Sequence, residues 1–449
     1  MKIIIVGAGE IGRHMAASVS REAHDTVVID ADEARATELD ELLDARVLQG
    51  DGSSVSLLLE AGVAECDLFF SLTSSNNTNL VSSSIAKKLG AKKVICRVHA
   101  SIQREEWLFD HRGHFGIDYI FSPERLASVE LAKFIRNPDS IMVEELARGR
   151  IELQQVRLPM ENPLEGKTLR ELKLPDRVRI GAIARQGTHI IPTANEKVLG
   201  GDMVIFFGEP RKLRETLDKL LKNNRRQEQP RVVILGGGEY GFALAQMLEA
   251  SHFRVRIFEV DRERAEELAN RLEKAVIINA DATSVNELKE EQVGEAEFFV
   301  AATSSDEDNV MTCLQAHNLG THSCLSLIHR ADYADAISSF GSKFGVVAAV
   351  SPREAVRREL TRFITSDSFH LVRKFGEVEV IETTVPEGSG IVGLSLQEIE
   401  WPEESVIIAR IHSIHATVPS ATDTVEPGDN LFAMVSAQTR KPFLKLVHG

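Results

Sequence analysis

The sequence predicts an α/β protein with two doubly wound parallel sheets, each followed by a small α+β module. Three observations lead to this prediction. Short β-branched apolar runs alternate with amphipathic helical stretches, which is typical of βαβ units. Two glycine-rich turns directly follow such runs, at Gly7 and at Gly236. The order of motifs in the first half then repeats in the second half, so the chain is a tandem duplication.

The first twelve residues, MKIIIVGAGEIG, predict a strand, a tight turn and a helix. Ile3–Val6 are apolar and β-branched, as in a buried strand. The turn has the spacing G-x-G-x-x-G, formed by Gly7, Gly9 and Gly12. Such glycines permit a tight turn, close approach of a pyrophosphate and close helix packing. The helix expected over Glu10–Ser20 directs free N–H groups at the turn, which therefore predicts a phosphate site. In the alternative interpretation the glycines only close a strand–helix turn.

An acidic residue ends the second predicted strand, Thr26–Ile29. Asp30 stands 18 residues after Gly12. A carboxylate at that strand tip can accept both hydroxyls of an adenosine ribose and would repel a 2′-phosphate. The pattern therefore predicts an adenine dinucleotide, or a similar adenosine phosphate, as ligand.

Helices and strands are expected to alternate through the rest of the first domain. The expected helices are Glu33–Leu43, Ser53–Ala61, Asn79–Leu89 and Ser122 to about Ile135. The expected strands are Arg46–Gln49, Asp67–Thr73, Lys93–Val98 and Phe115–Phe121. The strand tips carry Asp30, Asp51, Thr73 and Arg97. Ligands of doubly wound sheets bind outside the carboxyl ends of the strands, so these tips are candidate site positions.

From about Asn137 prolines punctuate short strands such as Glu152–Arg157, which predicts a small β-rich module ending in a helix near Pro210–Lys222. The polar stretch before Pro230 is expected to be a linker. The predicted domains are 1–136 and 231–365 for the doubly wound sheets, 137–223 and 366–449 for the modules, and 224–230 for the linker.

The second half repeats the first in register. Gly7 and Asp30 are 23 positions apart, as are Gly236 and Glu259. Further matched pairs are Asp51 with Asp281, Thr73–Asn79 with Thr303–Asn309, Pro192 with Pro419, and Gly201-Asp202 with Gly428-Asp429. Each copy is therefore predicted to hold one nucleotide site.

In each predicted site the glycine turn binds phosphate and the strand-tip acid, Asp30 or Glu259, binds the ribose. Asp51 and Asp281 are expected near adenine or the adjacent backbone. The Thr-Ser pair that follows in each copy is expected near phosphate or the distal ribose. Arg97 is expected to pair with a phosphate or another subunit. Helix capping by Thr73 and a surface ion pair of Arg97 are the alternatives. The candidate binding residues are Gly7, Ala8, Gly9, Glu10, Ile11, Gly12, Asp30, Asp51, Thr73, Ser74 and Arg97 in the first copy, and Gly236, Gly237, Gly238, Glu239, Tyr240, Gly241, Glu259, Asp281, Thr303 and Ser304 in the second.

The two predicted sites differ in charge. Leu327 stands at the register position of Arg97, and Ser75–Asn77 becomes Ser305–Glu307, which adds two acids. The second site is therefore expected to bind polyphosphates more weakly, or to prefer a different ligand.

Composition excludes several classes of protein. The net charge of −15 argues against a general nucleic-acid binder. The four cysteines show no C-x-x-C spacing and are expected to be buried, as in a reducing compartment. No apolar stretch approaches the ~20 residues of a membrane span, and the short N-terminal apolar run predicts no signal peptide. A soluble cytoplasmic protein is expected.

No catalytic or metal-binding constellation accompanies the predicted sites. The histidines of the modules, His189, His412 and His415, are joined by no regularly placed acid and are expected to be structural. Glu165–Thr168 resembles the end of a P-loop, but residue 161 is not glycine and no strand leads into it. Nucleotide binding without catalytic groups indicates a sensor, in which a ligand biases a two-state element.

These motifs resemble a known family. The pairs GAGEIG and GGGEYG, the acids Asp30 and Glu259, and the P-x-x-x-x-V-x-x-G-D signatures at Pro192 and Pro419 are similar to the TrkA family of Trk potassium-uptake regulators. Members of this family are tandem arrangements of domains called RCK or KTN with TrkA-C (RCK-C) modules. The resemblance covers essentially the whole chain.

The resemblance implies a regulatory subunit, not an enzyme, located peripherally on the cytosolic face of the inner membrane. It implies a ring of RCK domains, expected to be a homotetramer, on a TrkH- or TrkG-type potassium channel. NAD(H), or ATP and ADP at the same sites, would gate the pore. The family motif assigns ligand contacts to residues 7–11, Asp30, Thr73, Ser74 and Arg97, and to 236–240 and Glu259. An NAD-dependent oxidoreductase and a nucleotide sensor for another membrane partner are the alternatives.

Overall fold

A computed structural model describes residues 1–449 except 21–23, 106–107, 139, 148, 186, 222–228, 252, 331–332, 335, 338–344, 365–368 and 414, and the side chain of residue 141. The chain folds into two compact units, each built from both halves of the sequence. The first unit is Met1–Ala132 with Gln229–Ile364, and the second is Lys133–Glu228 with Thr365–Gly449.

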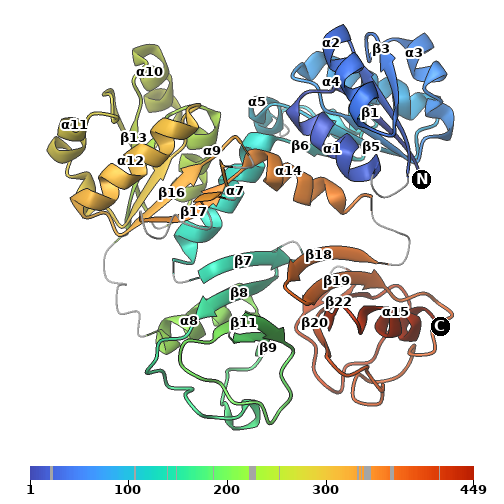
Figure 1. Ribbon diagram of the computed structural model, residues 1–449, viewed down its shortest axis with the longest axis vertical. Coiled ribbons are helices and arrows are strands. Elements are labelled where there is room, and N and C mark those ends of the chain that lie inside the picture. The colour runs from blue at the N-terminus through green and yellow to red at the C-terminus, as the bar shows by residue number, and fades with distance from the viewer. Residues whose placement is uncertain are drawn as a thin grey trace. The chain divides into compact units, whose positions relative to one another are not determined.

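The first unit contains two six-stranded parallel sheets of identical topology (Figure 1). Their strand orders are β3-β2-β1-β4-β5-β6 and β14-β13-β12-β15-β16-β17. The strands are β1 Lys2–Val6, β2 Asp25–Asp30, β3 Arg46–Gln49, β4 Leu68–Ser71, β5 Lys93–Arg97, β6 Tyr119–Phe121, β12 Arg231–Leu235, β13 Arg254–Phe258, β14 Val276–Ile278, β15 Phe298–Ala301, β16 Ser323–Leu327 and β17 Val346–Val350. This is the doubly wound order, so the predicted fold class is confirmed.

Helices connect these strands. In the first copy they are α1 Glu10–Ser20, α2 Glu33–Leu42, α3 Val55–Glu60, α4 Asn76–Leu89, α5 Ala100–Arg104, α6 His111–Phe115 and α7 Pro123–Arg136. In the second copy they are α9 Glu239–Glu249, α10 Arg262–Arg271, α11 Val285–Glu290, α12 Asp306–Leu319 and α14 Pro352–Thr361.

The central strand β1 is buried on both faces. Ile3 and Ile5 point into one apolar cluster, and Ile4 and Val6 into another. Continuous apolar sequence is what a parallel strand between two layers requires, which explains why the opening run does not alternate. The strand fixes the glycine turn that follows it.

Helix α14 of the second copy packs on the first copy, beside α1 (Figure 1). Val356 and Leu360 are buried in the cluster that contains Ile3 and Ile5. Arg358 forms an ion pair with Glu130 of α7 at 3.1 Å. The two doubly wound domains therefore share core within this unit.

The second unit contains two five-stranded antiparallel sheets, in the equivalent orders β10-β9-β11-β8-β7 and β21-β20-β22-β19-β18. The elements are β7 Ser140–Leu146, β8 Ile151–Arg157, β9 Val178–Arg185, β10 Thr188–Ile190, β11 Met203–Gly208, α8 Pro210–Leu220, β18 His370–Phe375, β19 Val378–Thr384, β20 Ser405–His412, β21 His415–Thr417, β22 Asn430–Ser436 and α15 Arg440–His448. One apolar cluster includes Phe207 and Met142 of the first module with Phe375 and Met434 of the second. The two modules thus share a core.

Most predicted element bounds differ from the structure by one or two residues, and two were wrong by more at one end. The strand expected over Phe115–Phe121 is only Tyr119–Phe121, because Asp110 caps the short helix α6 and the left-handed Gly116 (φ 67°) ends it. The helix expected from Asn79 begins at Asn76, because the Ser75 hydroxyl accepts the N–H of Thr78. Residues 224–228 of the predicted linker lie outside the described residues, and the domain boundaries stay predictions.

The four cysteines are buried and free, as expected. Burial raises the pKa of the Cys66 and Cys96 thiols to about 12, which keeps them unreactive at neutral pH. Among the described residues, no helix is both long enough and apolar enough to span a bilayer.

Candidate functional site

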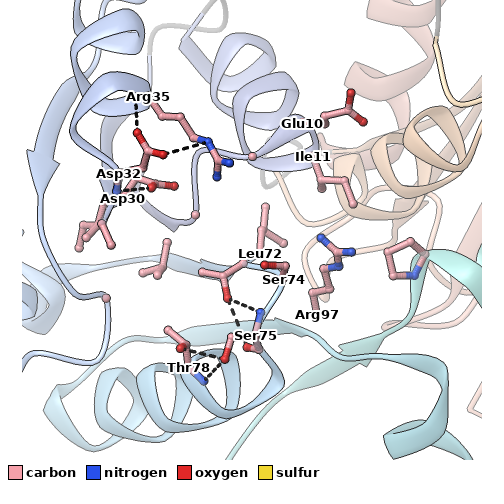
Figure 2. Close-up of a pocket in the computed structure, with 18 of the residues that line it drawn as sticks. Glu10, Ile11, Asp30, Asp32, Arg35, Leu72, Ser74, Ser75, Thr78 and Arg97 are labelled. Carbon is pink, nitrogen blue, oxygen red and sulfur yellow. Dashed lines mark hydrogen bonds and ion pairs between the residues drawn. The ribbon is translucent and has the colours of Figure 1, made fainter.

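A cleft of about 570 Å³ lies at the carboxyl ends of the strands of the first sheet (Figure 2). It brings together most of the residues predicted for the first site. Those that line it are Gly7, Gly9, Glu10, Ile11, Asp30, Asp51, Thr73, Ser74 and Arg97. Figure 2 shows Asp30 and Arg97 at opposite ends of the cleft, so an elongated ligand would span from the carboxylate to the guanidinium.

The three motif glycines have different roles in the structure. Gly7 has a φ of 102°, and a Cβ there would lie 2.8 Å from the backbone nitrogen of Thr73. A Cβ on Gly12 would lie 1.7 Å from the carbonyl oxygen of Gly7, so these two positions require glycine for packing. A Cβ on Gly9 would meet no atom within 4 Å. Gly9 therefore leaves free space that faces the cleft, as close approach of a ligand to the backbone requires.

The Asp30 side chain ties the glycine turn to the tip of β2. Its Oδ2 accepts the backbone N–H of Ala8 at 2.5 Å, and its Oδ1 accepts that of Asp32 at 2.8 Å. A carboxylate offers about four lone-pair sites, so each oxygen retains acceptor capacity. Asp30 is therefore placed to accept two hydroxyl groups from the cleft. Its near neighbour Asp51 also lines the cleft, and hydrogen bonds from the Ser53 N–H and hydroxyl lower the pKa of Asp51.

The Thr73 strand tip is organised by Asn79. The Thr73 hydroxyl donates to Asn79 Oδ1 at 2.6 Å, and Asn79 Nδ2 donates to the carbonyls of Thr73 and Arg97, both at 2.9 Å. Asn79 thereby joins the tips of β4 and β5 and fixes the backbone that carries Arg97. The N-cap of α4 is Ser75, so the alternative that Thr73 caps the helix is wrong. In the sequence Asn79 is evident only as a repeat marker, and this role was not predicted.

Residues that the sequence did not indicate also line the cleft. Those from the first copy include the polar residues Asp32, Arg35, Ser75 and Thr78. Four come from the second copy, namely Tyr240, His329, Pro352 and Arg353. Arg353 forms an ion pair with Glu10 at 2.9 Å. The four residues of the second copy could not be identified from the sequence, because only packing of the second copy on the first brings them to this cleft.

Tyr240 was predicted for the second site, yet it lines the first cleft. The backbone carbonyl of Tyr240 accepts the hydroxyl of Ser128 on α7 at 2.9 Å, which anchors it to the first copy. Burial, with a smaller contribution from Glu124, raises the pKa of its phenol, so the hydroxyl is neutral.

The second copy repeats the scaffold of the first. Glu259 accepts the N–H of Gly237 at 2.8 Å, as Asp30 accepts that of Ala8. Asn309 donates to the carbonyl of Leu327 at 3.0 Å, as Asn79 donates to that of Arg97. Leu327 and Arg97 are therefore structurally equivalent, as the repeat predicts. Hydrogen bonds from the Thr283 hydroxyl and N–H lower the pKa of Asp281, as those of Ser53 do at Asp51.

The turn of the second copy differs in what contacts it. Arg264 Nε donates to the carbonyl of Gly237 at 2.8 Å, and Arg264 Nη2 pairs with Glu239 at 3.2 Å. Arg104, from α5 of the first copy, pairs with the other oxygen of Glu239 at 3.1 Å. Side chains of both copies thus contact the residues of the second turn.

The prediction that no acid accompanies the module histidines was wrong for His412. Its Nδ1 lies 2.8 Å from Oδ1 of the buried Asp429, which Arg410 also contacts at 2.7 Å. Spacing could not reveal this pair, because His412 ends β20 and Asp429 stands just before β22, 17 positions later. Glu165–Thr168 lies in a turn of the antiparallel module, where Lys167 donates to the carbonyl of Pro163 at 2.8 Å, so it is no P-loop. Across the described ranges, no cluster of three or more His, Cys, Asp or Glu side chains could hold a metal ion.

Family comparison gives two tandem matches. The TrkA-N domain matches residues 3–123 and 232–352, and the TrkA-C domain matches 153–221 and 380–447. The Trk system potassium uptake protein TrkA of Halomonas elongata is 31% identical over 98% of this chain and 97% of its own length. The TrkA protein of Haemophilus influenzae is 30% identical over 98% of this chain and 97% of its own length.

Solved structures share the fold. The GsuK channel bound to NAD matches with a TM-score of 0.61 and 16% identity, over 99% of this chain and 78% of that chain. GsuK bound to ADP matches with a TM-score of 0.51 and 14% identity, over 81% of this chain and 69% of that chain. At such identities the likeness shows a common fold.

Proposed function

The chain belongs to the TrkA family of potassium-uptake proteins, which are regulatory proteins and not enzymes, and we propose that it is a nucleotide-sensing regulatory subunit of a Trk-type potassium channel. In this proposal NAD(H), ATP or ADP binds the first cleft, and the bound ligand changes how the protein acts on a TrkH- or TrkG-type membrane subunit. The protein would act at the cytosolic face of the membrane, as a homo-oligomeric ring.

The observation that supports a nucleotide most directly is the combination of groups in the first cleft. Asp30 at one end suits a ribose diol, the open backbone at Gly9 suits phosphate, and Arg97 at the other end suits further negative charge. The N-terminus of α1 faces the same turn and adds the positive end of a helix dipole. GsuK, which shares the fold, has been solved with NAD and with ADP.

A regulatory role requires a link from the cleft to a second element. Arg353 and Tyr240 of the second copy line the cleft of the first, so a ligand there would contact both doubly wound domains. A phosphate would compete with Glu10 for Arg353, which is 2.9 Å from that carboxylate. A ligand that favours one arrangement of the two domains shifts their equilibrium by its difference in affinity.

Calorimetric titration of the full-length protein with NADH, NAD, ATP and ADP tests the proposal. Wild type should bind at least one of them without consuming it. Asp30→Ala should weaken that binding by about 1–3 kcal/mol, because charged hydrogen bonds to the ribose are lost. Since Asp30 also holds the turn, Asp30→Asn, which keeps one acceptor oxygen, tests whether charge or turn geometry is responsible.

The matched control is Asp25→Ala, which removes an exposed aspartate at the opposite end of the same strand, β2. It should leave the affinity unchanged. If Asp30→Ala binds the nucleotide with unchanged affinity, Asp30 does not bind the ribose. No binding of any of the four nucleotides would contradict the proposed function.

A further inference from the structure

We propose that the second glycine turn is closed by an internal ion-pair latch, formed by Arg104, Glu239 and Arg264, so that each chain binds one nucleotide rather than two. The inference rests on the proposed function, because it concerns which of the two equivalent turns accepts the ligand. It makes these three residues the determinants of site selection in the duplicated protein.

The latch lies at the turn and pairs the arginines that would otherwise attract a phosphate. Glu239 is the first residue of α9, at the turn, and its carboxylate contacts Arg104 at 3.1 Å and Arg264 at 3.2 Å. Arg264 also donates to the carbonyl of Gly237 within the turn, at 2.8 Å. The three side chains are about one-fifth exposed, at 21%, 21% and 20%. The turn therefore faces a guanidinium that is already paired with an internal anion.

An aromatic ring holds the arginines in place. The buried Phe242, one turn along α9, has the guanidinium carbons of Arg104, Arg264 and Arg271 at 4.9, 5.8 and 4.3 Å from its centroid. Arg264 and Arg271 also hydrogen-bond Glu267 at 2.6 and 2.5 Å, which lowers the pKa of that carboxyl. Cation–π contact and several ion pairs thus fix the arginines in the closed arrangement.

The first turn lacks this arrangement at each equivalent position. Arg35 corresponds to Arg264, but it is 53% exposed and its nearest ion pair is a 3.7 Å contact with Asp32. Glu10 corresponds to Glu239, but it is 72% exposed and pairs with Arg353. Arg13 stands in place of Phe242, and Ala334 stands in place of Arg104. The sequence differences that remove the latch from the first copy are therefore the ones that leave its turn open.

A nucleotide phosphate entering the second turn would have to separate Glu239 from two arginines. It would then place its own negative charge beside a carboxylate that has lost both partners. Leu327 provides no compensating cation where the first copy has Arg97. Closure is thus an electrostatic consequence of the latch.

Binding stoichiometry of the unmodified protein is the first test. Calorimetric titration with ATP, ADP or NADH should give one equivalent per chain, and Asp30→Ala should abolish or weaken that single event. Two equivalents per chain in wild type would overturn the latch while leaving the proposed function intact. Absence of any binding would instead contradict the proposed function.

The second test opens the latch. Glu239→Gln removes the internal anion and leaves Arg104 and Arg264 to attract phosphate, so a second, weaker equivalent of ATP should appear. In the double variant Asp30→Ala with Glu239→Gln this new event should persist while the first event is weakened. The matched control is Glu266→Gln, which removes an exposed partner of Arg262 on the neighbouring helix α10 and should leave one equivalent.

Each outcome of the second test decides the matter. A second equivalent in Glu239→Gln alone supports the latch. One equivalent in a Glu239→Gln protein whose thermal unfolding matches wild type would show that Glu239 does not close the turn, and would overturn the inference. If the variant does not fold, the wild-type stoichiometry still decides whether the turn is closed.

Discussion

The two doubly wound domains have the same scaffold, but different side chains surround their glycine turns. Both begin with a glycine turn, tie its backbone to a strand-tip acid and join two strand tips through an asparagine. In the first copy the turn opens into a cleft that also reaches residues of the second copy. In the second copy Glu239, at the turn, pairs with Arg104 and Arg264, and Arg264 also donates to the turn backbone.

This difference shows that a nucleotide-binding motif has two separable functions. The first is structural, because the tight turn and the close helix need glycine whether or not a ligand binds. The second is recognition, which depends on side chains outside the motif. A duplicated domain can keep the first function while its second turn makes contacts with the neighbouring domain instead of a ligand.

The largest expected effect comes from Gly9→Val compared with Gly238→Val. A Cβ at either position meets no atom within 4 Å, so both variants should fold. In the first copy the added side chain would fill the space that a pyrophosphate needs, and affinity should fall by about 100-fold or more, roughly 3 kcal/mol. Gly238→Val should leave the affinity unchanged. Titration with ATP and NADH measures both.

The comparison would fail in one of two ways. Unchanged affinity of Gly9→Val would show that the ligand does not bind at the first turn. Loss of a binding event in Gly238→Val would show that the second turn is open. Circular dichroism and thermal unfolding establish that both variants retain the wild-type fold.

The structural function of the glycines should be the same in both copies. A Cβ on Gly12 would lie 1.7 Å from the carbonyl oxygen of Gly7, and one on Gly241 would lie 1.9 Å from that of Gly236. Gly12→Ala and Gly241→Ala should each destabilise the protein by about 1–3 kcal/mol, because the helix must move away from the strand. Denaturant unfolding measures this loss, and wild-type stability in either variant would contradict the close packing.

Sequence reasoning predicted the fold because the information is local and repeated. Apolar runs such as Ile3–Val6 define buried parallel strands, and the repeat at Gly236 confirms the period. The errors in element bounds arose where short polar residues decide the outcome. Ser75 starts α4 three residues early, and Asp110 with Gly116 makes a short helix where a strand was expected.

The candidate site was only half predictable. Residues of the motif and of the strand tips follow from topology, so Asp30 and Arg97 could be named from the sequence. Arg353 and Tyr240 could not, because they reach the first cleft only through packing of the second copy. The pairing of Arg104 with Glu239, 135 positions apart, has the same origin. Sequence periodicity carries no information on contacts between domains.

Arg97→Leu gives the first copy the residue of the second at this position. ATP affinity should fall by about 10-fold, near 1.4 kcal/mol, because one charge-assisted contact to a phosphate is lost. AMP, which has no further phosphates, should bind nearly as well as to wild type. Equal losses of affinity for ATP and AMP would show that Arg97 contacts the nucleoside and not the distal phosphates. The reverse change, Leu327→Arg, should not create binding while the latch remains closed.

The smallest expected effect compares the two antiparallel modules. Asp202 accepts Arg185 through both oxygens, at 2.9 and 2.8 Å, whereas the equivalent Asp429 is shared by Arg410 and His412. Although burial opposes it, hydrogen bonds from Arg185 and the Leu199 N–H lower the pKa of Asp202. A lowered pKa contributes stability above the unfolded value of about 3.9, and this contribution disappears as the pH falls through the folded pKa.

Asp202→Asn should therefore destabilise the protein by about 1 kcal/mol at pH 7, a modest amount because Arg185 is one-third exposed and screened by solvent. The difference from wild type should shrink below about pH 4, where the wild-type carboxylate also becomes protonated. Thermal unfolding at pH 7, 5, 4 and 3 measures this difference, and Asp429→Asn is measured alongside. A difference that stays constant or grows as the pH falls would contradict this. It would show that Asp202 stabilises its module through hydrogen bonds that asparagine cannot replace, and not through its charge.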